Sequence, residues 1–283
     1  MARWERIGSR GNVEDRRGMR RPAVALGGLG GVGIVVVLLV TLLGGGGGLD
    51  GALDQFAGSA AQSGAQSPEF QGEDDYQVFV ETVLGSTDET WGEIFGSSGL
   101  DYREPTLVLF RDFTASACGG ATSAVGPHYC PTDETIYLDE TFFEELTSRF
   151  GARGGDVAQA YVIAHEVGHH VQNRLGLMSQ VQEAQRQAAS TAEANDLSVR
   201  LELQADCLAG VWAYSIRDLG VFLPGEIDEA IDAAAAVGDD RIQQSVTGQL
   251  DPERWTHGSS EQRVAWFGTG YEEGDPSACS TFG

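Results

Sequence analysis

The spacing of hydrophobic positions predicts helices over most of the second half of the chain. The run from Val157 to about Leu175 is apolar nearly all round, which is typical of a buried helix. Asp156 is placed to cap this helix and Gly176 to end it. Further helical patterns cover a pair of helices within 76–95, then 139–150, 179–195, 197–219 and 225–237.

Two short runs have the composition of β-strands. Thr106–Phe110 follows a proline, and Thr135–Leu138 follows a segment rich in turn residues. Both precede the helix predicted over 157–175. The pattern therefore predicts an α+β fold that is mainly helical, with a small sheet. The second strand is a candidate edge to which an extended peptide could add.

The most apolar stretch of the chain lies near its beginning. No charged residue occurs from Pro22 to Leu43, and a stretch of this length is about enough to cross a bilayer as one helix. Four arginines lie between 16 and 21, and the next basic residue is Arg103. The positive-inside rule then predicts a cytoplasmic basic segment, 1–21, and an extracytoplasmic body, as in a single-pass protein of the cell membrane. A cleaved signal peptide is the alternative.

The segment that follows has no apolar periodicity. Residues 44–72 are rich in Gly, Ala, Ser and Gln, which favours a flexible linker. The remaining residues, 73–283, are numerous enough for one domain with one buried core.

Charge narrows the range of partners. The chain has 18 basic and 42 acidic side chains and a net charge of −24, and every basic residue is arginine. Residues 1–21 contain seven arginines and three acids, so the excess of acid lies in the body. An acidic body excludes nucleic acid as an expected partner, because phosphate binding needs a positive surface. It suits a secreted or salt-adapted protein, although the absence of lysine also fits a GC-rich coding bias.

His165, Glu166 and His169 form an H-E-x-x-H motif inside the helix predicted over 157–175. Residues four apart share one face of a helix, so both imidazoles can bind one zinc ion. Glu166 then lies beside the water that the metal activates. Two histidines on a solvated face are the alternative interpretation of the motif alone.

A catalytic zinc site normally takes a third protein ligand. A third histidine is excluded, because Leu175 occupies its place in the extended motif. His170 points about 100° away from His169 and is expected to support a ligand or to pack, and not to bind the metal itself. Glu202 and Asp206 lie four apart on a later helix; Glu202 can reach the metal, and Asp206 can accept the free N–H of a ligand histidine. An ordinary solvated acidic pair is the alternative.

An even number of cysteines in an extracytoplasmic domain predicts disulfides. Cys118 with Cys130 would close a glycine-rich loop, and Cys207 with Cys279 would attach the C-terminal tail to the helix of Glu202. A second zinc site formed by Cys118, His128 and Cys130 is the alternative, although its spacing fits no common pattern.

The residues that carry the zinc motif also carry a resemblance. The run 165–173, with Glu202 and Asp206 downstream, resembles the putative neutral zinc metallopeptidase family of membrane-anchored bacterial proteins. The segments 126–131, 136–139 and 256–263 match that family as well. More remotely, the E-x-x-x-D spacing is similar to that of the gluzincin metallopeptidases. The resemblance covers about residue 73 to the C-terminus and implies Glu202 as the third ligand and a zincin-like fold.

These observations predict a zinc-dependent peptidase that acts on a peptide or protein substrate. Glu166 is expected to take the proton of the attacking water and to pass it to the leaving amine. His257 is a candidate donor to the oxyanion, or else a loop histidine bonded to backbone. Two other functions fit the same residues: a zinc-bound envelope domain that binds a partner without proteolysis, and an amidase that acts on cell-wall peptides.

Overall fold

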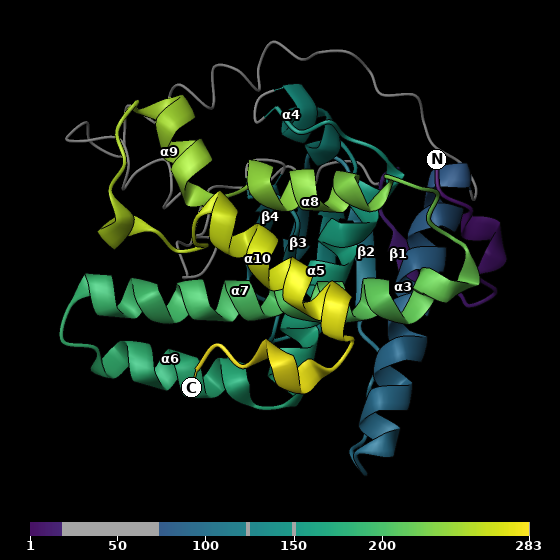
Figure 1. Ribbon diagram of the computed structural model, residues 1–283, viewed down its shortest axis with the longest axis horizontal. Helices are drawn as coiled ribbons and strands as arrows, with labels where there is room; N and C mark the ends of the chain where they lie inside the picture. The colour runs from purple at the N-terminus through teal and green to yellow at the C-terminus, as the bar shows by residue number, and fades with distance from the viewer. Residues whose placement is uncertain (19–73, 123–124, 149–150, 283) are drawn as a thin grey trace.

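The computed structural model describes residues 1–18, 74–122, 125–148 and 151–282 (Figure 1). The membrane helix predicted over 22–43 and the linker predicted over 44–72 lie outside these residues. Among the helices that are described, none combines the length and the apolar character that a membrane crossing needs.

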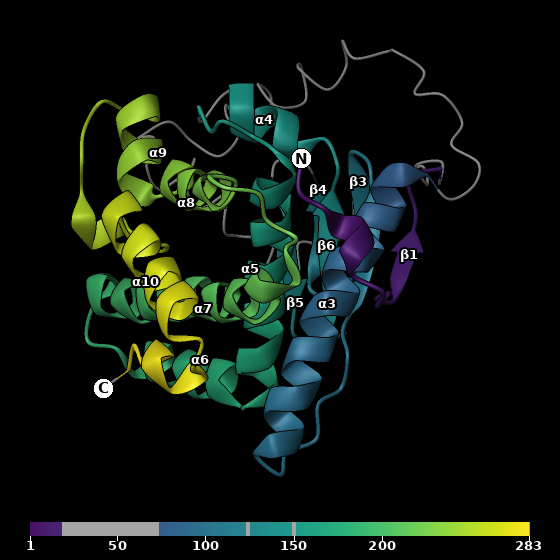
Figure 2. The same ribbon diagram turned by 45° about the vertical axis from the view of Figure 1, so that its right-hand side comes forward.

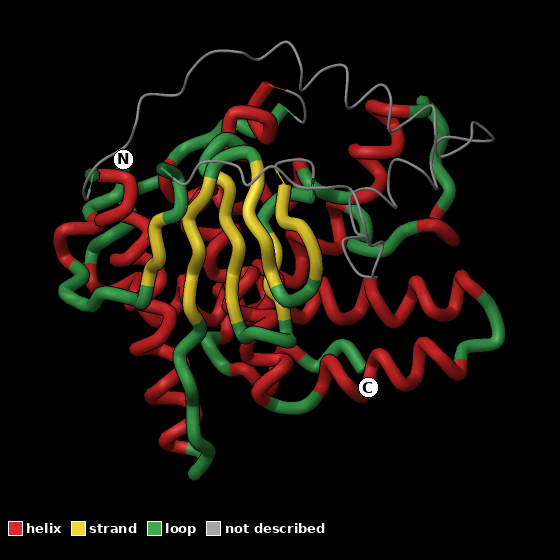
Figure 3. The backbone as a smooth tube through the Cα atoms, turned by 180° about the vertical axis from the view of Figure 1, so that it is seen from behind, coloured by secondary structure: helices red, strands yellow, loops and turns green. Residues whose placement is uncertain are grey.

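One layer of the molecule is a four-stranded sheet in the order β1-β2-β6-β5. Figure 3 shows the strands side by side, with the main helices behind them. β1, β2 and β6 are parallel, and β5 is antiparallel to β6. The strands of this sheet are β1 Val13–Asp15, β2 Thr106–Phe110, β5 His128–Cys130 and β6 Thr135–Asp139.

The prediction that 135–138 forms an edge strand is wrong. β6 pairs with β2 on one side and with β5 on the other, so its backbone has no open side. The strand at this end of the sheet is β5. It has only three residues, which is too short to show an alternating pattern in the sequence.

Helices account for most of the described chain, which confirms the predicted mainly helical α+β class. They are α3 Asp75–Ser97, α4 Phe142–Ser148, α5 Asp156–Arg174, α6 Leu177–Gln187, α7 Thr191–Ile216, α8 Ile227–Ala236, α9 Asp239–Val246 and α10 Ser260–Glu273. The zincin-like fold stays a prediction.

The predicted pair of helices within 76–95 is one helix, α3. Its polar middle does not break it, because the hydroxyls of Ser86 and Thr87 donate to carbonyls of the preceding turn of the same helix. Ser86 Oγ also accepts a hydrogen bond from the indole of Trp212 on α7, at 2.9 Å. The polar stretch between the two predicted helices is therefore part of one helix, and it contacts α7 in the interior of the domain.

The main core lies between the sheet and the helices α3, α5 and α7. A smaller cluster, which includes Val108, Phe110 and Tyr137, covers the opposite face of the sheet. It contains Ala121 of a hairpin formed by β3 (Phe113–Ser116) and β4 (Gly119–Thr122). Burial on both faces explains why β2 and β6 read as continuous apolar runs.

The motif helix α5 packs against α7 at close range. A Cβ atom on Gly168 would lie 3.0 Å from the backbone oxygen of Ala205, so only glycine permits this approach without a shift. Figure 2 shows α5, α7 and α10 as neighbouring layers on the side of the molecule away from β1. Glu202 and Asp206 of α7 are thereby carried to the face of α5 that bears the two motif histidines.

The sequence suggested that the N-terminal segment is separate from the domain. In the structure, residues 1–17 are part of the domain. Val13–Asp15 pairs with β2, and the residues before it contact α3 and the start of α5. The prediction that Asp156 caps α5 is wrong, because the N-cap residue of this helix is Gly155. The Asp156 carboxylate instead accepts hydrogen bonds from the backbone N–H of Ala2 and the indole N–H of Trp4, each at 2.7 Å.

Candidate metal centre

His165, His169 and Glu202 form one cluster. Their ligand atoms all lie within 4.8 Å of one another, and it is the only such group of three among the described residues. The Nε2 atoms face the Glu202 carboxylate, at 3.2 Å for His165 and 3.4 Å for His169. Two imidazole nitrogens and one carboxylate are a donor set typical of a catalytic zinc site.

The other nitrogen of each histidine is already engaged. His165 Nδ1 lies 2.8 Å from Asp206 Oδ1, and His169 Nδ1 lies 2.9 Å from Gln172 Oε1. With the proton on Nδ1, each ring donates to an oxygen and leaves Nε2 for a metal. The amide nitrogen of Gln172 donates to the backbone oxygen of Leu201, 2.7 Å away, which fixes that side chain.

Asp206 is the centre of a buried network. Its carboxylate accepts hydrogen bonds from His165, from the hydroxyl of Tyr161 at 2.6 Å, and from Arg263 at 2.8 and 2.9 Å. Asp206 is fully buried, and Arg263 is nearly so. Burial alone would raise the pKa of Asp206, but Arg263 and His165 hold it at about 2. The carboxylate therefore stays ionised and keeps accepting the proton of His165.

The electrostatics of the cluster suit a cation. Burial disfavours a charged imidazole, yet the Asp206 carboxylate and the Glu202 hydrogen bond raise the pKa of His165 to about 10. Burial also opposes the ionised form of Glu202, but His169 and His165 hold its pKa well below the usual range. The negative charge of Glu202 and Asp206 therefore favours a positive charge beside the two histidines, which is the charge that a metal ion carries.

Glu166 is buried beside this cluster. Its exposed fraction is 6%, and its Oε2 atom has no hydrogen-bond partner within the described residues. A buried carboxylate oxygen that lacks a donor is costly, because water no longer solvates it. Its charge is close enough to His169 to contribute to the raised pKa of that histidine. The orphaned oxygen fits a site that receives a metal ion and a water.

His257 lies on the loop before α10, where Asp239 holds it. The backbone N–H groups of Thr256, His257 and Gly258 all donate to Asp239 Oδ2, at 2.8, 2.6 and 3.0 Å. Asp239 Oδ1 lies 3.3 Å from His257 Nδ1. Burial disfavours the charged ring, but the bond to Asp239 and the nearby Glu202 raise the pKa of His257. The loop of His257 packs on the helix of Glu202, because a Cβ atom on the adjacent Gly258 would lie 3.2 Å from the side chains of Val199 and Leu203.

His170 packs, as the helical geometry predicted. It is fully buried, with its two ring nitrogens 3.0 Å from the Tyr129 hydroxyl and 2.6 Å from the Arg103 backbone oxygen. Asn173 also donates to the Tyr129 hydroxyl, at 2.9 Å. Since Tyr129 belongs to β5, His170 and Asn173 fix the last strand of the sheet to the motif helix.

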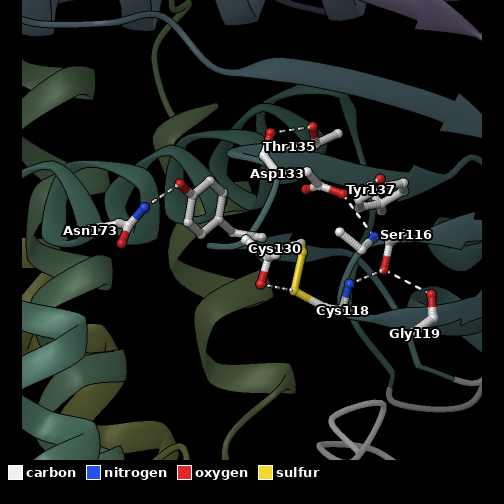
Figure 4. Close-up of a disulfide and its surroundings, with 11 residues drawn as sticks. Ser116, Cys118, Gly119, Cys130, Asp133, Thr135, Tyr137 and Asn173 are labelled. Carbon is white, nitrogen blue, oxygen red and sulfur yellow. Dashed lines mark hydrogen bonds between the residues drawn. A yellow bond between two sulfur atoms is a disulfide. The ribbon is translucent and has the colours of Figure 1, made fainter. Parts of the chain in front are cut away.

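Both predicted disulfides are present. Cys118 pairs with Cys130, and Cys207 pairs with Cys279. Figure 4 shows the first bond, with Asp133, Thr135 and Tyr137 in its surroundings. Because Cys118 and Cys130 are bonded to each other, they offer no thiolate for the alternative zinc site with His128. His128 instead stacks on Tyr137, with ring centroids 5.3 Å apart.

Four residues that position the site were not predicted from the sequence as part of it: Tyr161, Gln172, Asp239 and Arg263. Tyr161 was interpreted as an apolar residue of the motif helix, and Asp239 stands 18 residues before His257. Arg263 lies in the segment 256–263 that matches the zinc peptidase family, and this was the only available signal for it.

Comparison with known proteins places these residues in a family. A family model described as "Putative neutral zinc metallopeptidase" matches residues 2–282. The chain is 49% identical over 211 residues to "Uncharacterized protein YpfJ" of Escherichia coli (strain K12), which covers 75% of this chain and 73% of the relative. It is 43% identical over 234 residues to "Uncharacterized protein Rv2575" of Mycobacterium tuberculosis, which covers 79% and 75%. No solved structure gives a significant match. The chain belongs to the putative neutral zinc metallopeptidase family.

Proposed function

We propose that this protein hydrolyses peptide bonds with zinc held by His165, His169 and Glu202. The observation that carries the proposal is the buried Oε2 atom of Glu166, which lies beside the ligand cluster and has no hydrogen-bond partner among the residues that the structure describes. A carboxylate in this position is expensive for the fold, and a general base for water is the role that requires it. The description of the family supports the same activity.

Each residue has a distinct task in the proposed reaction. Zinc, when bound, supplies a Lewis acid that polarises the scissile carbonyl and acidifies a water. Glu166 accepts the proton of the attacking water and delivers it to the amine that leaves. Asp206 and Gln172 keep the ligand histidines in the Nδ1–H tautomer.

His257 is the proposed donor to the oxyanion that forms on the carbonyl. Its Nδ1 atom is directed to Asp239, and the bond to this carboxylate raises the pKa of the ring against the effect of burial. The ring can then donate from Nε2 while Asp239 holds it in place. We propose that the substrate is an extended peptide that adds to β5. This strand ends the sheet and pairs with β6 on one side.

The test is peptide hydrolysis by the purified chain, measured together with its zinc content. We expect a peptide library to be cleaved, and cleavage to stop on chelation and to return with zinc. Glu166→Gln should keep zinc and lose activity by about 10²-fold or more. Glu183→Gln, at an exposed glutamate of α6, is the matched control and should change neither.

Two results would contradict the proposal. Glu166→Gln with undiminished activity would remove Glu166 as the base. A zinc-loaded chain that cleaves no peptide would favour the non-proteolytic domain, unless cell-wall peptides are hydrolysed, which would identify the amidase instead.

We also propose that residues 22–43 attach the protein to the cell membrane and that the domain acts outside the cytoplasm, where its two disulfides are stable. The apolar run and the arginines before it support attachment. The position of residues 1–17 in the fold restricts how that attachment is made.

A further inference from the structure

The first seventeen residues occupy a continuous surface of the domain. Val13, Glu14 and Asp15 pair in parallel register with Leu107–Leu109 of β2. The backbone N–H of Leu107 donates to Asn12 O at 2.9 Å, and that of Arg16 donates to Leu109 O at 2.7 Å. The segment therefore supplies the outermost strand of the sheet on the β2 side (Figure 2).

The residues before β1 contact three other parts of the domain. The indole of Trp4 packs edge-on against Phe79 of α3 and Phe222, with ring centroids 5.4 and 6.1 Å apart. Its N–H and that of Ala2 donate to Asp156 at the start of α5. The backbone N–H of Arg3 donates to the Val221 oxygen at 2.8 Å. These contacts join the segment to the helix that carries the metal ligands.

Glycine occurs on both sides of the contact with α3. A Cβ atom on Gly85 would lie 2.5 Å from the backbone nitrogen of Arg10, and one on Gly11 would lie 2.5 Å from the Leu84 side chain. Real Cβ atoms do not approach so closely. The surface of α3 is thus shaped for the backbone of this particular segment. The family model likewise begins to match at residue 2.

Arg17 attaches the end of the N-terminal segment to the domain by ion pairs. Its side chain is fully buried and forms ion pairs with Asp15 at 2.8 Å, Asp74 at 3.0 Å and Glu140 at 2.8 Å. Asp74 is the N-cap of α3 and accepts a hydrogen bond from Gln77 N–H. The two ends of the connection over 19–73 are therefore held together by one ion pair. A buried arginine with three carboxylates is stable only as a complete group.

We propose that the surface formed by the outer edge of β2, the Gly85 face of α3 and Asp156 is a binding site for residues 1–17 of the same chain. The N-terminus and the metal centre then face the same side of any membrane that residues 22–43 enter. Because Arg17 and Asp74 lie side by side in the domain, the chain between them begins and ends on the same side of a membrane. It must therefore cross the bilayer an even number of times or not at all. One crossing by 22–43, with a cytoplasmic N-terminus and an extracytoplasmic domain, is incompatible with this arrangement.

The experiment is thiol labelling in intact cells by a maleimide that does not cross membranes. Glu5→Cys reports on the N-terminal segment and Glu93→Cys on α3, and both positions are exposed. The wild-type chain, whose four cysteines are in disulfides, is the blank, and the labelled peptide is identified by mass spectrometry. We expect both cysteines to react before lysis, or both only after it. Reaction of one before lysis and the other only after would overturn the proposal.

Hydrogen exchange on the full-length protein tests the docking itself, independently of zinc and of hydrolysis. Arg17→Ala should speed exchange of the Leu107 amide, which donates to Asn12, on the order of a hundredfold. Arg3→Ala is the matched control, because the Arg3 side chain is exposed and the residue contacts the domain through its backbone N–H, so that variant should exchange as the wild type does. A Leu107 amide that exchanges freely in the wild-type protein would overturn the proposal.

Discussion

The two carboxylates beside the motif histidines, Glu202 and Asp206, stabilise different charges. Within the part of the chain that the structure describes, the polar contacts of the Glu202 carboxylate are with the two imidazoles, at 3.2 and 3.4 Å, and these rings can release their protons. Asp206, in contrast, contacts a buried arginine that cannot lose its charge. Removing the first carboxylate should therefore affect the metal, and removing the second should affect the metal and the fold.

Glu202→Ala is expected to lower zinc affinity by at least about tenfold while the chain stays folded. Asp206→Asn should lower zinc affinity by about 10–100-fold, and it should also reduce the free energy of unfolding of the metal-free chain by about 3 kcal/mol. Competition with a chromogenic chelator measures the first quantity, and urea unfolding measures the second. Unchanged zinc content in Glu202→Ala would remove Glu202 from the ligand set.

Asp88 of α3 is a buried carboxyl outside the site. Its exposed fraction is 6%, and its Oδ2 atom has no partner among the described residues. Burial, with a smaller contribution from Glu104, raises its pKa from 3.8 to about 7. Between those pH values the folded chain holds a proton that the unfolded chain has released. The contribution of Asp88 to the free energy of unfolding therefore falls as the pH rises from about 4 to 7.

Asp88→Asn should remove the decrease in the free energy of unfolding that the ionisation of Asp88 causes. We expect the variant to be more stable than the wild type at pH 8 by more than about 1 kcal/mol, and the advantage to shrink towards pH 4. Urea unfolding of the metal-free protein at several pH values measures it. Glu89→Gln, at the exposed neighbour, is the control. An advantage that is the same at pH 4 and pH 8 would show that ionisation of Asp88 is not its cause.

At the scale of elements, the crossing of α7 and α10 determines where Arg263 reaches Asp206. The two helices touch through their backbones: a Cβ atom on Gly270 would overlap the carbonyl oxygen of Cys207, and one on Gly210 would overlap that of Phe267. Gly268, two residues from Gly270 on the same helix, has open space around it. Substitutions at Gly268 and Gly270 therefore differ in whether the new Cβ atom meets α7.

Gly270→Ala should destabilise the protein by about 1–3 kcal/mol or more, because α10 must move away from α7. Gly268→Ala should be neutral or stabilise it by up to about 1 kcal/mol, because alanine restricts the unfolded chain. Thermal unfolding with and without zinc compares them. Equal effects of the two substitutions would mean that the close approach of α7 and α10 does not limit stability.

The same scale shows what sequence patterns can predict. The motif helix was predicted within about a residue, because its apolar positions and its terminal glycine are local signals. Glu202 and Asp206 were found because they share a helix face. Asp239 and Arg263 have partners 18 and 57 residues away, and no local pattern marks such pairs. β1 was missed because three residues in an arginine-rich segment show no strand period.

At the scale of the whole molecule, the C-terminal tail is attached to the metal centre by a disulfide. Cys207 adjoins Asp206 on α7, and its bond to Cys279 joins positions 72 residues apart in the sequence, with α8, α9 and α10 between them. The amide of Gln204 also donates to the Cys279 backbone oxygen at 2.9 Å. The bond between Cys118 and Cys130 spans only 12 residues and ties the β3–β4 hairpin to β5.

The longer loop should contribute more to stability. In the chain-entropy description, replacing Cys207 and Cys279 by alanine should reduce the free energy of unfolding by about 4 kcal/mol, against about 3 kcal/mol for Cys118 and Cys130. Urea unfolding of both double variants in the metal-free state measures the difference. The opposite order would mean that local contacts of the hairpin outweigh loop length. The expected order would show that the disulfide holding α10 beside Asp206 is the stronger constraint on the fold, because it restricts the longer part of the unfolded chain.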